Sequence, residues 1–151
     1  MNNIFNSNFE VSLRVVLILD EYHPLCLTSD TITNIDFISV YGATFEIAET
    51  NLHGDNIFKF SQLTIRNQII EQALITLLYK GLATIDFDER GFVYKISEKG
   101  MIYSASLTSD YANTFRETVF KTRKFIINNT EQDVLNMIRG YSIRSLKKGE
   151  K

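Results

Sequence analysis

The chain has 151 residues, 44% hydrophobic and 23% charged, which fits one globular domain with at most a short appendage and excludes wholesale disorder. The formal net charge of −2 is uneven, because residues 1–115 carry 7 Lys/Arg against 14 Asp/Glu and residues 116–151 carry 9 against 4. A single cysteine excludes an internal disulfide, the N-terminus lacks a secretory pattern, and no apolar run approaches the roughly 20 residues of a membrane-spanning helix. We therefore expect a soluble, cytoplasmic protein without a membrane partner.

The first predicted helix begins after Ser7, where Ser7-Asn8-Phe9-Glu10 is a capping box, and ends before His23-Pro24. It is apolar on nearly all sides, so we expect either the central helix of the domain or part of a partner interface. A short extended piece over 25–27 leads to the N-cap cluster Thr28-Ser29-Asp30. The second helix then extends toward Gly42.

Residues 42–60 show no clean periodicity and are predicted to form a long ordered loop, held down by Phe58 and Phe60. Ser61 is the predicted cap of a long helix that ends at Lys80-Gly81. Two strands over 82–87 and 92–96 follow, joined by a tight turn.

The C-terminal third of the sequence is predicted to be helical. Ser97 caps one helix, and Thr108 or Ser109 caps the next, whose apolar face extends to Ile126. A last short helix spans Thr130 to Met137 and is followed by basic residues.

This order of elements predicts an α+β fold, a winged helix-turn-helix with a C-terminal helical extension. We interpret residues 1–107 as a winged-helix domain that includes the long loop at 42–60. Residues 108–139 are interpreted as C-terminal helices and residues 140–151 as a basic tail.

The outward face of the predicted recognition helix is poorly suited to DNA. It carries Thr64, Gln68, Glu71, Gln72, Ile75 and Tyr79, and the predicted wing tip is net negative. Phosphate contacts need Lys or Arg, whereas aromatic and apolar residues without charge are typical of protein interfaces. We therefore predict that Gln68, Gln72, Ile75 and Tyr79 bind a protein partner; the alternative is that Ile75 and Tyr79 pack beneath the loop or a C-terminal helix.

The sequence does not predict catalysis. His23, Cys26 and His53 are not at metal-ligand spacing, and glycine-rich phosphate loops and nucleophile elbows are missing. We expect a non-enzymatic protein that uses no metal or cofactor.

The C-terminal quarter offers a second candidate surface. Its basic residues Arg116, Lys121, Arg123 and Lys124 lie on one predicted helix, and more follow in the tail. They predict docking to an acidic protein or to a DNA backbone, or else they are solvated surface charges.

Several segments, in order over about residues 4–127, resemble the middle component of ABC-three-component systems. The resemblance rests on the following motifs: Phe5-Asn6-Ser7-x-Phe9-Glu10, Leu13-Arg14-Val15, Asp36-Phe37, Val40-Tyr41, Asn51-Leu52-His53-Gly54-Asp55, Arg66, Gly81-Leu82, Tyr94-x-Ile96-Ser97-x-x-Gly100 and Ser109-x-Tyr111. Leu52, His53 and Asp55 form the part that is similar to the family's Leu-His loop motif.

The resemblance implies an adaptor in a bacterial anti-phage defence system of the Lamassu kind. Such a subunit would link an SMC/Rad50-like ABC ATPase to an effector protein, often a nuclease, and would contact DNA only indirectly or weakly through its basic C-terminal region. The sequence leaves the role of Arg66 open, with the carboxylates of Asp36 and Glu71 as candidate partners for it.

Two alternatives remain at this point. One is a winged-helix transcription regulator that binds DNA through the basic C-terminal helices, with an affinity that falls steeply with salt. The other is an accessory winged helix of a chromosome-organising SMC complex.

Overall fold

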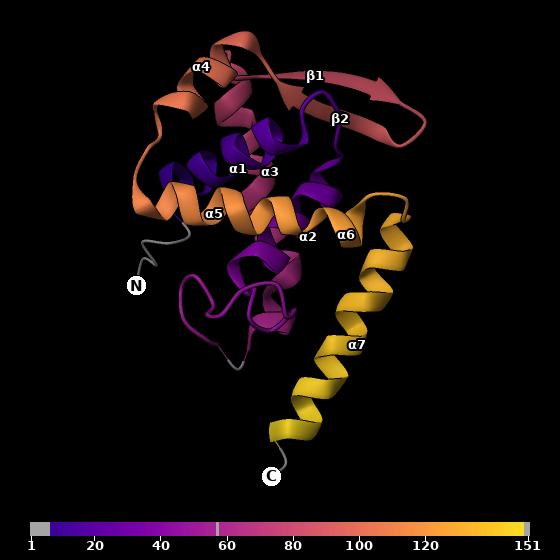
Figure 1. The fold of residues 1–151 in the computed structure, drawn as a ribbon. Helices are drawn as coiled ribbons and strands as arrows, with labels where there is room; N and C mark the ends of the chain where they lie inside the picture. The colour runs from indigo at the N-terminus through magenta and orange to yellow at the C-terminus, as the bar shows by residue number, and fades with distance from the viewer. Residues whose placement is uncertain (1–6, 57, 150–151) are drawn as a thin grey trace.

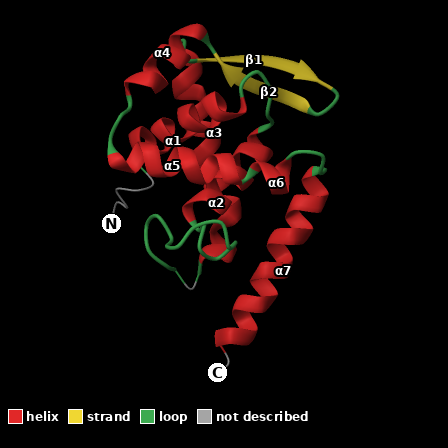
Figure 2. Cartoon of the chain, in the orientation of Figure 1, coloured by secondary structure: helices red, strands yellow, loops and turns green. Residues whose placement is uncertain are grey.

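The computed structural model describes residues 7–56 and 58–149, and it shows an α+β chain that is mostly helical with a small antiparallel hairpin (Figure 1, Figure 2). In chain order the elements are α1 (Asn8–Tyr22), α2 (Ser29–Val40), the 3-10 turn η2 (Lys59–Gln62), α3 (Leu63–Tyr79), β1 (Ala83–Asp88), β2 (Gly91–Ile96), α4 (Glu98–Ser106), α5 (Asp110–Lys121), α6 (Arg123–Ile126) and α7 (Glu131–Gly149). The order of helices and hairpin agrees with the predicted one.

α1 is the central helix of the fold. Ser7 caps it by accepting a hydrogen bond from the backbone N–H of Glu10 at 3.2 Å, as predicted. Its buried residues include Val15, Val16 and Ile18, each fully shielded from solvent, and α2, α3, α4 and α5 all pack against it. The apolar surface that surrounds α1 therefore forms the core of the molecule itself.

The extended piece before α2 joins the hairpin. Leu27 exchanges two backbone hydrogen bonds with Tyr94 on β2, both at 2.8 Å. The next residue, Thr28, caps α2 by accepting from the backbone N–H of Thr31. The predicted cap cluster and extended segment are thus confirmed, and together they fix the start of α2 against the sheet.

The predicted cap of α3 at Ser61 is wrong. Ser61 lies inside η2, where its hydroxyl donates to the carbonyl of Phe58 at 2.8 Å, and α3 begins at Leu63. Because η2 runs directly into α3, the chain enters the helix from another helical turn rather than from an extended capping residue. The other end agrees with the prediction, since Gly81 follows it with φ of +73°.

The long loop is held down by one of the two predicted aromatic residues. Phe60 packs with ring centroids 5.5 Å from Phe37 and 6.3 Å from Phe45. Phe58 is 62% exposed, so its predicted packing role is wrong, because the turn into η2 directs only Phe60 toward the core.

The C-terminal helices pack back on the first half of the chain (Figure 1). The helix predicted to continue to Ile126 is interrupted at Thr122, a fully buried residue whose hydroxyl pairs with that of Tyr22 at 2.6 Å. α5 therefore ends at Lys121 and α6 begins at Arg123.

α7 is longer than the sequence analysis predicts, because it continues past Met137 to Gly149. Val134 and Ile138 are buried on its inner side, and Tyr141 extends this side by packing on Phe45 at 4.9 Å. Residues 140–149 of the basic segment are thus part of a helix. Like every other helix in the described part of the chain, α7 is not long and apolar enough to cross a membrane.

Candidate protein-binding surface

Polar residues from separate parts of the chain meet in one buried network. The Arg14 Nε on α1 donates to Asp36 Oδ1 on α2 at 2.7 Å, and Arg66 Nη1 on α3 donates to the other carboxylate oxygen. Asp36 is the fully buried partner of Arg66, whereas the other predicted candidate, Glu71, is exposed. The three side chains therefore fasten α1, α2 and α3 together.

The charges in this network depend on each other. Burial alone would raise the pKa of Asp36, but the facing guanidinium groups of Arg14 and Arg66 hold it below its ordinary value. Burial likewise disfavours the charged form of Arg14, and the carboxylate of Asp36 nevertheless raises the pKa of Arg14. Asp36 and Arg14 are thus both charged, in the manner of a buried ion pair that has its partners in place.

His53, a residue of the loop motif, lies beside the same buried network. Its Nε2 lies 2.6 Å from the hydroxyl of Tyr111 on α5, and the two rings are stacked. Burial, followed by the positive charge of Arg14, lowers the pKa of His53 to about 4, and burial raises the pKa of Tyr111 to about 12. Both groups are therefore neutral at physiological pH, and they hold the loop on α5.

The other residues of the loop motif are also used within the chain. Leu52 donates its backbone N–H to the carbonyl of Val40 at 2.8 Å. The Asp55 carboxylate accepts from Lys59 Nζ at 2.9 Å. Among the described residues there is no His/Cys/Asp/Glu group that could hold a metal ion. The contacts of the loop motif and of the buried network therefore hold the loop and the first three α-helices together.

The outer side of α3 presents apolar side chains to solvent. Ile75 is 66% and Tyr79 93% exposed, so neither packs beneath the loop or a C-terminal helix. Ile65, which the sequence analysis overlooked, is 58% exposed on the same side. The predicted polar members of this face, Gln68 and Gln72, are exposed with them. We call this set the α3 face.

The hairpin adds a second exposed apolar surface. Phe87 and Phe92 are cross-strand partners whose rings meet edge to face with centroids 5.4 Å apart, and Ile85 and Tyr94 are also directly opposed across the strands. Directly opposed residues in an antiparallel pair share one side of the sheet, and this register continues to the buried pair Ala83 and Ile96. The side of the hairpin that covers the core thus runs outward into exposed Ile85, Phe87 and Phe92, which we call the hairpin face.

α3 packs against β1, and the two faces carry little positive charge. Burial, and then the nearby Glu71 carboxylate on α3, raise the pKa of Tyr94. Tyr94, the cross-strand partner of Ile85, therefore lies within electrostatic reach of Glu71 on α3. Contiguous exposed apolar side chains mark protein interaction sites, and aromatic residues with few charges are enriched there. The chemistry of this surface suits a protein partner better than a phosphate backbone.

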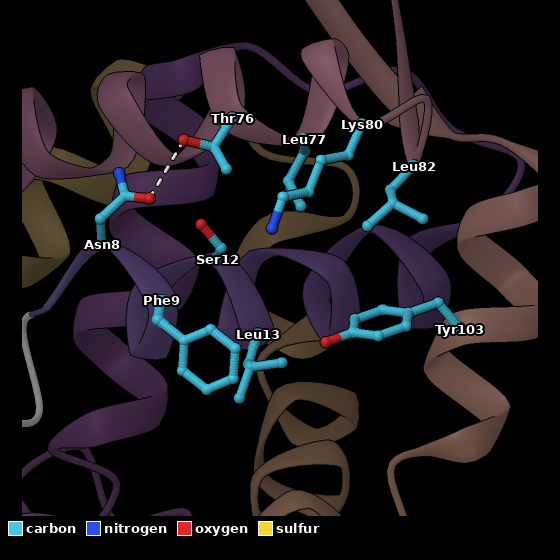
Figure 3. Close-up of a pocket in the computed structure, with 9 residues that line it drawn as sticks. All are labelled: Asn8, Phe9, Ser12, Leu13, Thr76, Leu77, Lys80, Leu82 and Tyr103. Carbon is cyan, nitrogen blue, oxygen red and sulfur yellow. Dashed lines mark hydrogen bonds between the residues drawn. The ribbon is translucent and has the colours of Figure 1, made fainter.

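A pocket lies beside the α3 face, between the start of α1, the end of α3 and α4 (Figure 3). Its volume is about 100 Å³, and it is lined by Asn8, Phe9, Ser12, Leu13, Thr76, Leu77, Lys80, Leu82 and Tyr103. The hydroxyl of Ser12 is buried and has no hydrogen-bond partner in the part of the chain that the structure describes. In Figure 3 the Lys80 amine extends over the pocket toward Ser12, and Tyr103 closes its other side. We call it the Ser12 pocket.

Two of the predicted basic site residues already have intramolecular partners. Arg116 donates to the carbonyls of Leu107, at 2.7 Å, and Ser104, near the end of α4. Arg123 donates to the carbonyl of Glu21 near the end of α1 and lies over the ring of Tyr22 at 5.2 Å. Both guanidinium groups thus satisfy carbonyls at helix ends, where cations are favourable.

The other two predicted basic residues, Lys121 and Lys124, are exposed on α5 and α6. Exposed Arg139, Arg144 and Lys147 continue the positive charge along α7. The roles of these residues in partner or DNA binding stay predictions.

Comparison with known proteins gives one family. The model of the ABC-three component (ABC-3C) system Middle Component 2 family matches residues 4–148. No curated protein and no solved structure matches the chain.

Proposed function

Because this chain belongs to the ABC-three component (ABC-3C) system Middle Component 2 family, we propose that it is a non-catalytic adaptor which links an SMC/Rad50-like ABC ATPase to an effector, often a nuclease. The proposed setting is anti-phage defence of the Lamassu kind, in the cytoplasm. DNA recognition and ATP hydrolysis then belong to the ATPase, and this subunit supplies binding surfaces.

The observation that carries the proposal is the apolar surface made by the α3 and hairpin faces. In a winged helix-turn-helix, which is our interpretation of residues 1–107, α3 corresponds to the recognition helix and the hairpin to the wing. Here the exposed residues at those places include Ile75, Tyr79, Phe87 and Phe92, where a DNA reader needs Lys or Arg. A winged helix with such a surface is suited to docking on another protein.

The transcription-regulator alternative finds less support. It relies on Arg116 and Arg123, whose guanidinium groups hydrogen-bond to backbone carbonyls within the chain. A regulator would then have to rely on the exposed Lys121 and Lys124 and on the exposed basic residues of α7 for its contacts with a DNA backbone.

The test is co-expression of this chain with the products of the flanking genes, followed by size-exclusion chromatography with light scattering. We expect a stable complex that contains an ABC ATPase. Ile75→Asp, which places a charge on the α3 face, is expected to weaken that complex by at least about tenfold in Kd.

Leu146→Asp on α7 is the matched control, because Leu146 is 67% exposed and Ile75 is 66% exposed. Loss of binding for the Ile75 variant alone supports the α3 face. A chain that ignores every flanking-gene product and instead binds duplex DNA at low salt would make the regulator the correct function.

A further inference from the structure

We propose that the Ser12 pocket is a binding site for an acidic side chain, Asp or Glu, carried on an apolar segment of the protein partner that lies along α3. This inference rests on the proposed adaptor function. It adds to that function the chemistry of one anchor residue and the place where the anchor enters.

The pocket has the size to hold a single side chain. Sites for drug-sized molecules and cofactors have volumes of about 300–1,000 Å³. The Ser12 pocket, at about 100 Å³, holds only a few atoms. Small well-packed pockets of this kind typically receive one anchor residue of a protein partner.

The polar groups of the pocket indicate that the anchor side chain is acidic. Ser12 is 7% exposed, and its hydroxyl has no hydrogen-bond partner among the described residues. A buried hydroxyl without a partner costs free energy, so a ligand that hydrogen-bonds to it is favoured. Lys80, which extends from α3 toward α1 in Figure 3, adds a positive charge to the pocket lining, and of the described lining residues none is acidic. A carboxylate can accept from both groups, and charge-assisted hydrogen bonds are the stronger kind.

The apolar walls of the pocket indicate that the residues beside the acidic anchor in the partner are apolar. Leu13, Leu77 and Leu82 form the walls together with Phe9 at the rim, and the Phe9 side chain is 65% exposed. Such a side chain on the rim is available to cover an apolar residue beside the anchor.

The position of the pocket ties it to the surface already described. Thr76 and Lys80 line it from α3, and Ile75 and Tyr79 of the α3 face are their neighbours in the same helix turns. A partner segment that covers Tyr79 therefore passes directly beside the pocket opening. The α3 face and the Ser12 pocket together form one continuous docking site with an apolar ridge and an acid-binding end.

The first experiment is an NMR titration of the full chain with a capped Leu-Glu-Leu peptide at millimolar concentration. Capped Leu-Gln-Leu and Leu-Lys-Leu peptides are the matched controls. We expect the Glu peptide to shift the amide signals of Ser12, Thr76 and Lys80, and the Gln and Lys peptides to shift them much less. The absence of a Glu-specific shift overturns the proposal. Shifts that depend on the protein concentration without peptide would assign the pocket to a second copy of the chain and would also overturn it.

The second experiment uses the complex with the flanking-gene product. Lys80→Glu is expected to raise the Kd by at least about tenfold. Lys95→Glu, an exposed lysine on β2, is expected to change it less than about twofold. Equal effects of the two substitutions would show only a general response to charge and would contradict the acid-binding pocket.

Ser12→Ala separates binding from folding. It removes a buried hydroxyl that lacks a partner, so we expect the Tm to stay the same or to rise while binding weakens. If the wild-type chain binds no flanking-gene product, the proposed function fails and the peptide titration alone decides the pocket. If the wild type binds and Lys80→Glu binds equally well, the pocket proposal fails and the proposed function stands.

Discussion

Arg14 on α1 and Asp36 on α2 form an ion pair whose Nε–Oδ1 distance is 2.7 Å, with side-chain exposures of 1% and 0%. Arg66 on α3 approaches the second oxygen of the same carboxylate. One acidic group thus serves two buried cations, and the three helices that it connects include α3, which carries the candidate docking face. The buried network therefore sets the orientation in which α3 presents Ile75 and Tyr79 to a partner.

Removal of Asp36 is predicted to be strongly destabilising. Asp36→Ala leaves two buried guanidinium groups without their counter-ion, and breaking a buried ion pair in this way typically costs about 3–5 kcal/mol of unfolding free energy. Urea denaturation measures this loss. Glu117→Ala is the control, because Glu117 is an exposed acid on α5 and surface substitutions usually change stability by less than about 0.5 kcal/mol. Similar small losses for both variants would contradict a structural role of the network.

Acid is predicted to destabilise the protein through His53. Its folded pKa of about 4 lies below its ordinary value of 6.5, so the unfolded chain takes up the proton first as the pH falls. The unfolding free energy contributed by neutral His53 is therefore complete above about pH 6.5 and is lost progressively down to about pH 4. Asp36, whose folded pKa is lowered, adds a further loss at still lower pH as its carboxylate becomes protonated.

Urea midpoints measured between pH 7.5 and 4.5 test the His53 prediction. His53→Gln, which does not titrate, is expected to flatten the dependence over this range. A variant with the same slope as the wild type would show that another group is responsible.

Most element boundaries follow from the sequence because local residues determine them. Ser7, Thr28 and Ser97 each cap the predicted helix through a hydrogen bond to a backbone N–H three residues on. The sequence pattern does not give the end of α7, because that end depends on a contact with a distant part of the chain. Tyr141 continues α7 by packing on Phe45, and no local pattern shows that contact.

In the candidate site, too, the features set by local residues follow from the sequence, and those set by distant contacts do not. The helical periodicity identifies Gln68, Gln72, Ile75 and Tyr79 as one outward face, and all of these residues are exposed. The Ser12 pocket was not predicted, because it brings together α1, α3 and α4 from distant parts of the sequence. Alternation along the two strands would have identified Phe87 and Phe92 as surface candidates, because both lie on the side of the hairpin that faces the core further along.

Gly100 is predicted to be irreplaceable by alanine. A Cβ at Gly100 would lie 2.0 Å from the backbone carbonyl oxygen of Leu82, so Gly100→Ala must push α4 away from α3 and the hairpin. We expect a loss of about 1–3 kcal/mol, as for other overpacked sites. Gly140 in α7 has nothing within 4 Å of such a Cβ, and Gly140→Ala is expected to stabilise the helix by about 0.5–1 kcal/mol. Thermal and urea unfolding of both variants provide the measurement, and equal effects would contradict the close approach.

Substitutions of the basic residues of α5 and α6 are predicted to affect stability in two different ways. Arg123→Ala removes the hydrogen bond to the carbonyl of Glu21 and the contact with the Tyr22 ring, so we expect a stability loss of about 1–3 kcal/mol. Lys124→Ala is expected to stay within about 0.5 kcal/mol of the wild type, because Lys124 is exposed. Urea denaturation of the two variants distinguishes these outcomes.

DNA binding must be tested at the exposed lysines rather than at the arginines that hydrogen-bond within the chain. A charge reversal at Arg116 or Arg123 disturbs carbonyl contacts near the ends of α4 and α1, so a loss of binding there would also follow from loss of folding. Lys121→Glu and Lys124→Glu change exposed charges and leave those contacts intact. If the adaptor function is correct, both lysine variants still form the complex that Ile75→Asp disrupts. A duplex affinity that falls in both lysine variants and falls steeply with salt in the wild type would instead show a real DNA contact on this side of the molecule.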